Sequence, residues 1–298
     1  MYDRLVIAID GSDEAQYAAR RGLELARVFD ATVYALHVVE QKALRLTETA
    51  DEKTRLRELG AAILDDIEAL ASELEYPVTT KLAEGKPAVQ ISEYADEQDA
   101  DLIVIGRQGM TGLGKRLLGG VTEQVLHQSD IPVFVVPGED GVSETNKGYS
   151  RVLIPTDGSE NAEAATPHGV TISQHFDSAI HVLSVVDLQA AGGAFNAGGL
   201  EKEFIERLEV KGQGAVDRVR DEITDIDPDI KVRTAVERTT SFEGAAAGVR
   251  DYVGNTEIDL VVMGSHGRSN LRRQLLGSVA STVLRTVDVP VLVVKRTA

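Results

Sequence analysis

The feature that most constrains the fold is an internal repeat, in which both ends of the first half of the chain recur in the second half. The segment RLVIAIDGSDEA, which begins at Arg4, recurs as RVLIPTDGSENA from Arg151, and DIPVFVV recurs as DVPVLVV. Matching residues are 147 apart near the start of each copy and 158 apart near its end, so the second copy holds a net insertion of 11 residues. We therefore predict two related domains, at 1–138 and 149–298.

Each copy alternates short apolar runs with amphipathic stretches. Continuous apolar runs are typical of strands that are buried on both faces, and the stretches between them have helical spacing. Strands that alternate with helices form a parallel sheet with helices on both faces. We therefore expect an α/β fold with two tandem, doubly wound, Rossmann-like domains, each with a five-stranded parallel sheet. The strands are expected at 5–9, 32–39, 78–83, 101–105 and 133–136, and at 152–155, 179–186, 230–236, 260–263 and 291–294.

Composition argues against several classes of function. The chain has 48 acidic and 31 basic side chains, a net charge of −17, which argues against general nucleic-acid binding. It has no cysteine, which excludes disulfides, thiolate metal sites and cysteine nucleophiles. No apolar run approaches the roughly 18–20 residues of a membrane helix, and the first residues do not resemble a signal peptide. We expect a cytoplasmic protein with neither a membrane nor a nucleic acid as partner.

The charge has two further features. Lysine is scarce, with 10 lysines against 21 arginines, a pattern that resembles the proteins of halophiles that accumulate salt. An ordinary acidic protein that is kept soluble by its charge is the alternative. The net charge is −12 over residues 1–147 and −5 over residues 148–298, so the second copy is less repulsive to an anionic ligand.

A glycine-rich motif follows the fourth expected strand of the second copy. Gly264-Ser-His-Gly267 is followed by nine residues and then by Gly277-Ser278, which opens an expected helix. Glycine lets the backbone approach a ligand closely, and the free N–H groups at a helix start bind anions. The motif therefore predicts an anion site, although Ser278 can also simply cap the helix. Three nearby arginines add positive charge or form a solvated helix face: Arg268, Arg272 and Arg273.

An aspartate ends the first expected strand of each copy, Asp10 in I-D-G-S and Asp157 in T-D-G-S. Ligands of doubly wound sheets bind where the winding reverses, so this carboxylate faces the glycine loop if the first and fourth strands are neighbours. There it can accept bonds from ribose hydroxyls or hold a metal through water, and capping of the next helix is the alternative. His266 lies inside the loop as a phosphate contact or an acid–base group, and a histidine without a chemical role is the alternative.

With these motifs the chain resembles a tandem universal stress protein, two domains of that family in one polypeptide. The resemblance rests on the D-G-S segments, the H-V-V and S-V-V strand endings, the glycine pattern with L-L-G-S, and the closing V-P-V-L-V-V. It implies the strand order 3-2-1-4-5 and an ATP site in the second copy, where Asp157 meets the ribose, the Val185 backbone pairs with adenine, and the glycines and Ser278 surround the phosphates. The cofactor-binding residues expected on this basis are Pro155, Thr156, Asp157, Val185, Met263, Gly264, Ser265, Gly267, Arg268, Gly277, Ser278 and Val279.

The first copy departs from the pattern at its last position. It reads Gly106-Arg-Gln-Gly109, nine residues, and then Gly119-Gly120, so the final hydroxyl is absent. Loss of one hydrogen bond to a charged group costs about 1.5–3 kcal/mol, roughly a tenfold to hundredfold loss of affinity. We therefore expect the second site to bind more tightly. The residues of the weaker candidate site are Asp10, Val38, Gly106, Gly109, Gly119 and Gly120.

The sequence favours a nucleotide-binding protein with a stress-response or signalling role, and ATP as the ligand. Magnesium or manganese would accompany the nucleotide, with Asp157 as a ligand through water. The P-loop pattern G-x-x-x-x-G-K-S/T is absent from the sequence, and catalytic residues stay unassigned. Two alternatives remain open: a slow ATP hydrolase or nucleotidyl-transfer enzyme of the adenine nucleotide α-hydrolase type, and an interaction module that needs no nucleotide.

The last strand expected in each copy is apolar and begins with proline, which sheet edges tolerate. Exposed edges usually find partners. The family resemblance implies pairing through this strand, so we expect the two copies to form a pseudo-dimer within the chain, and a homodimer is a further possibility.

Overall fold

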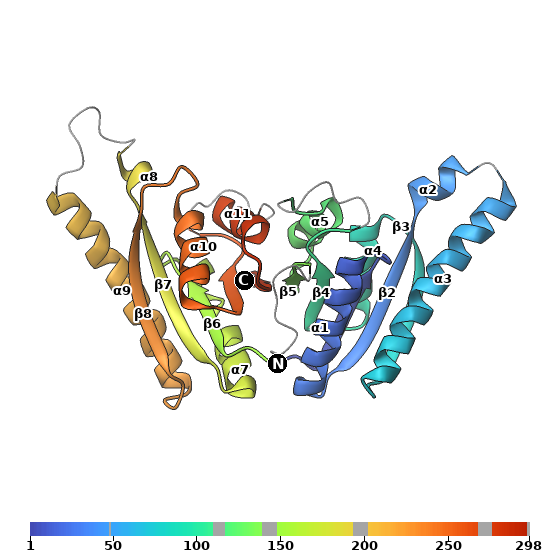
Figure 1. Ribbon diagram of the computed structural model, residues 1–298, viewed down its shortest axis with the longest axis horizontal. Helices are drawn as coiled ribbons and strands as arrows, with labels where there is room; N and C mark the ends of the chain where they lie inside the picture. Colours follow the sequence, from blue (N-terminus) through green and yellow to red (C-terminus); the bar gives the residue numbers. More distant parts are fainter. Residues whose placement is uncertain (48, 110–116, 139–147, 193–201, 268–275, 297–298) are drawn as a thin grey trace. The chain divides into compact units, whose positions relative to one another are not determined.

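The structure is a computed structural model that describes residues 1–47, 49–109, 117–138, 148–192, 202–267 and 276–296. It divides the chain into two compact units, Met1–Val142 and Ser143–Ala298. Each unit is an α/β domain around a parallel sheet (Figure 1).

The sheet of the first unit has β1 at its centre. β1 pairs with β2 and β4, β2 pairs with β3, and β4 pairs with β5, all in parallel. The order β3-β2-β1-β4-β5 confirms the expected doubly wound topology. The strands are β1 (Arg4–Ile9), β2 (Thr32–Glu40), β3 (Val78–Gly85), β4 (Leu102–Gly106) and β5 (Val133–Val136).

Helices cover both faces of this sheet (Figure 1). α1 (Asp13–Phe29) and α3 (Ala50–Glu73) pack on one face, and α4 (Pro87–Glu97) and α5 (Gly120–Gln128) on the other, while the short α2 (Gln41–Leu46) follows β2. Side-chain caps set where the long helices begin. The hydroxyl of Ser12 accepts the N–H of Ala15 at the start of α1, and a capping box starts α3.

The second unit repeats this topology, with the order β8-β7-β6-β9-β10. Its strands are β6 (Arg151–Pro155), β7 (Ala179–Asp187), β8 (Val232–Thr239), β9 (Leu260–Gly264) and β10 (Val291–Val294). β8 begins two residues later than the sequence predicts. Residues 227–230 form a turn instead, in which the N–H of Asp229 donates to Oδ1 of Asp227 over 3.0 Å.

The helices of the second unit differ from the first at one place. Where the first unit has the single helix α1, the second has α6 (Glu160–Glu163) and α7 (Thr166–Phe176). Pro167 lies in the first turn of α7, because a proline has no N–H to continue a helix but fits a helix start. The other helices are α8 (Leu188–Gly192), α9 (Lys202–Ile226), α10 (Ala245–Thr256) and α11 (Ser278–Thr286).

α7 and α9 cover one face of the second sheet, and α10 and α11 lie together on its other face (Figure 1). β1 and β6 are buried along most of their length, as their continuous apolar sequences predict, and every residue of β4 and β9 is buried. Within the described ranges, no helix has both the length and the apolar composition that crossing a membrane requires.

Candidate functional site

A cavity of about 190 Å³ lies at the carboxyl ends of β6 and β9 in the second unit. This is the point where the winding of the sheet reverses, and where doubly wound sheets bind their ligands. The described lining residues come from β6, β7, β9, α6, α10, α11 and the loops between them. They are Pro155, Thr156, Asp157, Ala162, Leu183, Val185, Ala245, Val249, Met263, Gly264, Ser265, His266, Gly267, Gly277, Ser278, Val279 and Ala280.

A proline explains why β6 and β9 separate at this cavity. The N–H of Thr156 donates to the carbonyl of Leu183 on β7 over 2.8 Å. Because successive residues of a strand bond to opposite neighbours, the nitrogen of Pro155 faces β9, and it has no hydrogen to donate. The pairing of β6 with β9 ends at Leu153, whereas Ala8 takes the place of Pro155 in the first unit and still pairs with β4.

Asp157 lies on the turn that follows β6. Its Oδ1 accepts the N–H of Ser159 over 3.0 Å and the hydroxyl of Ser159 over 2.6 Å. The same hydroxyl accepts the N–H of Ala162 and caps α6. Ser159 therefore has two roles: it caps α6, and it orients the carboxylate of Asp157. That carboxylate lines the cavity.

Two glycines bring the loop after β9 against β6 and α6. A β-carbon on Gly264 would overlap the carbonyl oxygen of Asn161, and one on Gly267 would overlap Oδ2 of Asp157. Glycine is needed at both positions, because a side chain at Gly264 would push the loop away from α6 and one at Gly267 would push it away from the aspartate.

The helix α11 points its N-terminus at the same cavity. Gly277 is its N-cap residue, and the N–H of Gly277 donates to the carbonyl of Ser265 over 2.8 Å. The first N–H groups of any helix have no acceptor within that helix, and they carry the positive end of its dipole. Ser278, Val279 and Ala280, the first three residues of α11, all line the cavity. This wall therefore suits an anion.

His266 and Ser265 complete the polar lining. Nδ1 of His266 lies 2.9 Å from Oγ of Ser265, within hydrogen-bonding distance. Among the described residues of the cavity wall, Asp157 carries the one carboxylate. The structure holds no group of three or more metal-ligating side chains within its described residues.

The cavity brings together all but one of the cofactor-binding residues expected from the sequence. The exception, Arg268, lies outside the described residues, as do Arg272 and Arg273. Six lining residues were not in the expected set: five apolar residues and His266, which the sequence had placed inside the glycine loop.

Residue spacing could have identified some of the apolar ones. Leu183 is two residues before Val185 on β7, so both side chains lie on one face of the sheet, and Ala245 and Val249 share a face of α10. The apolar residues are Ala162, Leu183, Ala245, Val249 and Ala280.

The first unit builds the same backbone frame around Asp10. Oδ1 of Asp10 accepts the N–H and the hydroxyl of Ser12 over 3.0 and 2.6 Å, and a β-carbon on Gly109 would overlap its Oδ2. The N–H of Gly119, the N-cap of α5, donates to the carbonyl of Arg107 over 2.8 Å. The duplication has therefore preserved the relation between the aspartate, the loop and the helix start.

Charge distinguishes the loop of the first unit. Oε1 of Glu14 accepts the N–H of Gln108 over 2.9 Å, and Arg107 is buried beside them. Burial raises the pKa of Glu14, although the Gln108 N–H and the charge of Arg107 oppose that shift. In the second unit, neutral Asn161 stands at the position of Glu14. In the first loop, therefore, the carboxylate of Glu14 already accepts the N–H of Gln108.

Comparison with known proteins agrees with the repeat. The model of the Universal stress protein family matches residues 1–137 and 148–295. A universal stress protein of Methanocaldococcus jannaschii is 39% identical over 142 residues, which cover 46% of this chain and 82% of that protein. One of Mycolicibacterium smegmatis is 27% identical over 308 residues, covering 98% of this chain and 96% of that protein. The crystal structure of a universal stress protein from Archaeoglobus fulgidus covers 99% of this chain and 96% of its own, with a TM-score of 0.72 at 21% identity.

Proposed function

The chain belongs to the universal stress protein family, with two domains in tandem, and on this premise we propose that its second domain binds an adenine nucleotide, ATP in the first place. The observation that carries the proposal is the convergence of Asp157, the loop from Gly264 to Gly267 and the first turn of α11 on one cavity. A carboxylate, close-packed glycine backbone and a helix N-terminus supply the partners that a ribose and a phosphate chain need.

Each part of the nucleotide has a matching wall in this proposal. The carboxylate of Asp157 accepts hydrogen bonds from the ribose hydroxyls. The N–H groups at the start of α11 and the hydroxyl of Ser278 donate to the phosphates. The base lies against apolar side chains from β7, β9 and α10, and the backbone of Val185 supplies its polar contacts. The apolar side chains meant here are Leu183, Val185, Val249 and Met263.

A divalent cation fits this site only together with the nucleotide. Magnesium takes oxygen ligands and is usually held by one or two carboxylates, substrate phosphates and water. The carboxylate of Asp157 lines the cavity, and two bonds from Ser159 to its Oδ1 fix its orientation there. We therefore propose that magnesium or manganese binds through the phosphates, with Asp157 as a ligand through water.

The test is calorimetric titration of the full chain with ATP, supported by mass spectrometry of any nucleotide that the purified protein releases. We expect one tight site, which Gly277→Val removes because its side chain would occupy the approach to the α11 N-terminus. Gly119→Val is the matched control, since the N-cap of α5 has the same geometry in the first domain. Absence of ATP binding by the unchanged protein would overturn the proposal and favour an interaction module that needs no nucleotide.

Slow ATP hydrolysis or nucleotidyl transfer is a second candidate function, favoured by one observation. His266 lines the cavity and lies 2.9 Å from the hydroxyl of Ser265, so an imidazole that can carry a proton is next to the proposed phosphate site. The test is incubation with ATP, with and without magnesium. Turnover that requires both Asp157 and His266 supports an enzyme, and turnover that survives Asp157→Ala and Gly277→Val indicates contamination.

The wider role follows from binding. Most of the cavity wall consists of backbone donors and apolar side chains, a composition that suits holding a ligand. We therefore propose that nucleotide occupancy carries a stress-response or signalling role in the cytoplasm. The pseudo-dimer within the chain, the homodimer and the halophilic origin stay predictions from the sequence.

A further inference from the structure

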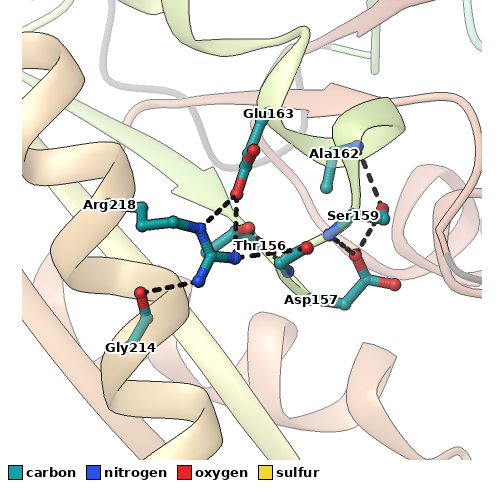
Figure 2. Close-up of polar contacts among 8 residues, drawn as sticks. Thr156, Asp157, Ser159, Ala162, Glu163, Gly214 and Arg218 are labelled. Atoms are coloured by element: carbon teal, nitrogen blue, oxygen red, sulfur yellow. Dashed lines mark hydrogen bonds and ion pairs between the residues drawn. The ribbon is translucent and has the colours of Figure 1, made fainter.

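Arg218 on α9 reaches across to the turn that carries Asp157 (Figure 2). Its Nη2 donates to the carbonyl of Gly158 over 3.2 Å, and its Nη1 donates to the carbonyl of Gly214 on its own helix over 3.0 Å. Nε and Nη2 lie 3.3 and 3.1 Å from Oε1 of Glu163 on α6. One guanidinium therefore connects α9, α6 and the turn between β6 and α6.

Arg218 and Asp157 hold opposite ends of the same peptide group. The carbonyl of Gly158 and the N–H of Ser159 belong to one peptide unit, which is planar and rotates as a whole. Arg218 donates to the oxygen of this peptide unit, and the N–H of the same unit donates to Oδ1 of Asp157 over 3.0 Å. Rotation of this peptide would break both contacts together. The position of the Arg218 guanidinium is thereby coupled to the orientation of the carboxylate in the cavity wall.

The turn needs an external support because its backbone is unusual. Gly158 has a φ of +76°, and its N–H donates to Oγ1 of Thr156 over 3.0 Å. Glycine adopts this conformation easily, but it also has access to many others. Contacts from a neighbouring helix reduce that freedom, so the Arg218 bond selects one orientation of the Gly158–Ser159 peptide.

The first domain supports the matching turn in a different way. Gly60 of α3 and Gly212 of α9 lie against matching residues of the second strand of each sheet, which places α3 and α9 in register 152 residues apart. In that register Asp66 stands where the second domain has Arg218. Ile63 packs on Gly11 instead, and a β-carbon on Gly11 would be 2.8 Å from its Cδ1. The arginine contact is therefore specific to the domain with the proposed nucleotide site.

The contact is placed to affect the site more than the fold. The side chain of Arg218 is 56% exposed and that of Glu163 is 26% exposed. Ion pairs with this much exposure contribute little to the stability of a protein. The hydrogen bond to the Gly158 carbonyl, by contrast, acts directly on the peptide that orients Asp157.

We propose that Arg218 is a positioning residue, which orients Asp157 toward the ribose hydroxyls and thereby strengthens nucleotide binding, with Glu163 holding the guanidinium in place. The role in binding rests on the proposed function, while the effect on the turn does not. Arg218 touches the peptide that holds Asp157, and it is not assigned a contact with the nucleotide. Its influence should therefore depend on whether the ligand has ribose hydroxyls for Asp157 to bind.

The binding test compares ATP with 2′,3′-dideoxy-ATP, which lacks the hydroxyls. We expect Arg218→Ala to weaken ATP binding about fivefold, the order of one modest hydrogen bond, and to leave the weaker binding of dideoxy-ATP unchanged. Asp66→Ala, at the matching position of the first domain, should alter neither affinity. An equal loss for both nucleotides in the Arg218→Ala variant would overturn the proposal, because a general structural defect does not distinguish the two ligands.

A second measurement needs no nucleotide and separates this proposal from the proposed function. Amide hydrogen exchange of the nucleotide-free protein should accelerate in a peptide that spans residues 156–162 when Arg218 is replaced by alanine. The reason is that the hydrogen bond from the Ser159 N–H to Oδ1 of Asp157 is then no longer held in one geometry. Exchange in the matching segment 9–15 should not change, and Glu163→Gln should have a smaller effect in the same segment as Arg218→Ala. Unchanged exchange at 156–162 would overturn the positioning role. A protein that shows the faster exchange but never binds ATP would refute the proposed function and leave the effect on the turn standing.

Discussion

Gly267 lies so close to Asp157 that a β-carbon on the glycine would overlap Oδ2 of the aspartate. The loop after β9 and the carboxylate after β6 therefore form one packed unit. The same relation holds between Gly109 and Asp10 in the first domain. Because both domains have it, this packing supports the fold of each loop, and replacement of the two glycines can separate the cost to the fold from the cost to ligand binding.

We predict that Gly267→Ala weakens ATP binding at least tenfold, because the added methyl group must move either the loop or the carboxylate that meets the ribose. Gly109→Ala introduces the same overlap in the first domain and should lower the melting temperature by a similar amount without changing the tight ATP site. Calorimetric titration and thermal unfolding of the two variants measure these effects. Equal loss of ATP affinity in both variants would contradict the assignment of the tight site to the second domain.

The helix starts give a second matched pair. A β-carbon on Gly277 would lie 3.1 Å from the carbonyl oxygen of Ser265, and one on Gly119 would lie 3.1 Å from that of Arg107. We expect Gly277→Val to abolish most ATP binding, because its side chain would stand beside the N–H groups that receive the phosphates, while Gly119→Val costs less. Titration of both variants with ATP checks this. The reverse ranking would place the tight site in the first domain.

A serine hydroxyl at the start of the helix can be removed from the second domain, at Ser278, and introduced into the first domain, at Gly120. Ser278→Gly should lower ATP affinity roughly tenfold to hundredfold, the effect of one hydrogen bond to a charged group. Gly120 has room for the reciprocal change, since a β-carbon there would meet no atom within 4 Å. Gly120→Ser in a chain that also carries Gly277→Val should then increase binding by the first domain, measured by the same titration. No gain would indicate that Glu14, which occupies the Gln108 N–H, has the larger influence.

The sequence was sufficient to predict the fold because the signals were local and occurred twice. Buried strands such as β4 and β9 are continuous apolar runs, and the repeat showed that both halves follow one order of elements. The break between α6 and α7 was not predicted, because the repeat itself suggested one helix like α1. Pro167 was the local signal for that break.

The candidate site was predicted where it depends on glycine and aspartate, and missed where it depends on tertiary contacts. The position of Gly267 next to Asp157 follows from two motifs on neighbouring strands. The contact from Arg218 could not be predicted in this way, because α9 is exposed at that residue and its register with the turn depends on helix packing. The carboxylate of Glu14 was missed for the same reason, since it meets Gln108 across 94 residues of sequence.

Salt should stabilise this protein. Its net charge of −17 creates repulsion that is screened over about 3 Å at molar salt, compared with about 10 Å at 0.1 M. We predict partial unfolding in dilute buffer and a melting temperature that rises steadily up to molar KCl, measured by circular dichroism. Full stability in dilute buffer would contradict the halophile hypothesis and favour an ordinary acidic protein.

His168 on α7 should make stability depend on pH. Burial lowers the pKa of its imidazole to about 4 in the folded protein, from an ordinary value of 6.5. Between these values the folded state keeps His168 neutral while the unfolded state takes up a proton, so the free energy of unfolding falls as the pH falls below 6.5. At pH 5.5 this loss is about 1.4 kcal/mol relative to pH 7.5.

Denaturant unfolding of the wild-type chain and of His168→Gln at both pH values measures this loss of unfolding free energy, because contributions from all other groups cancel in the comparison. A difference between the two proteins that is the same at pH 7.5 and pH 5.5 would show that His168 does not contribute this pH dependence.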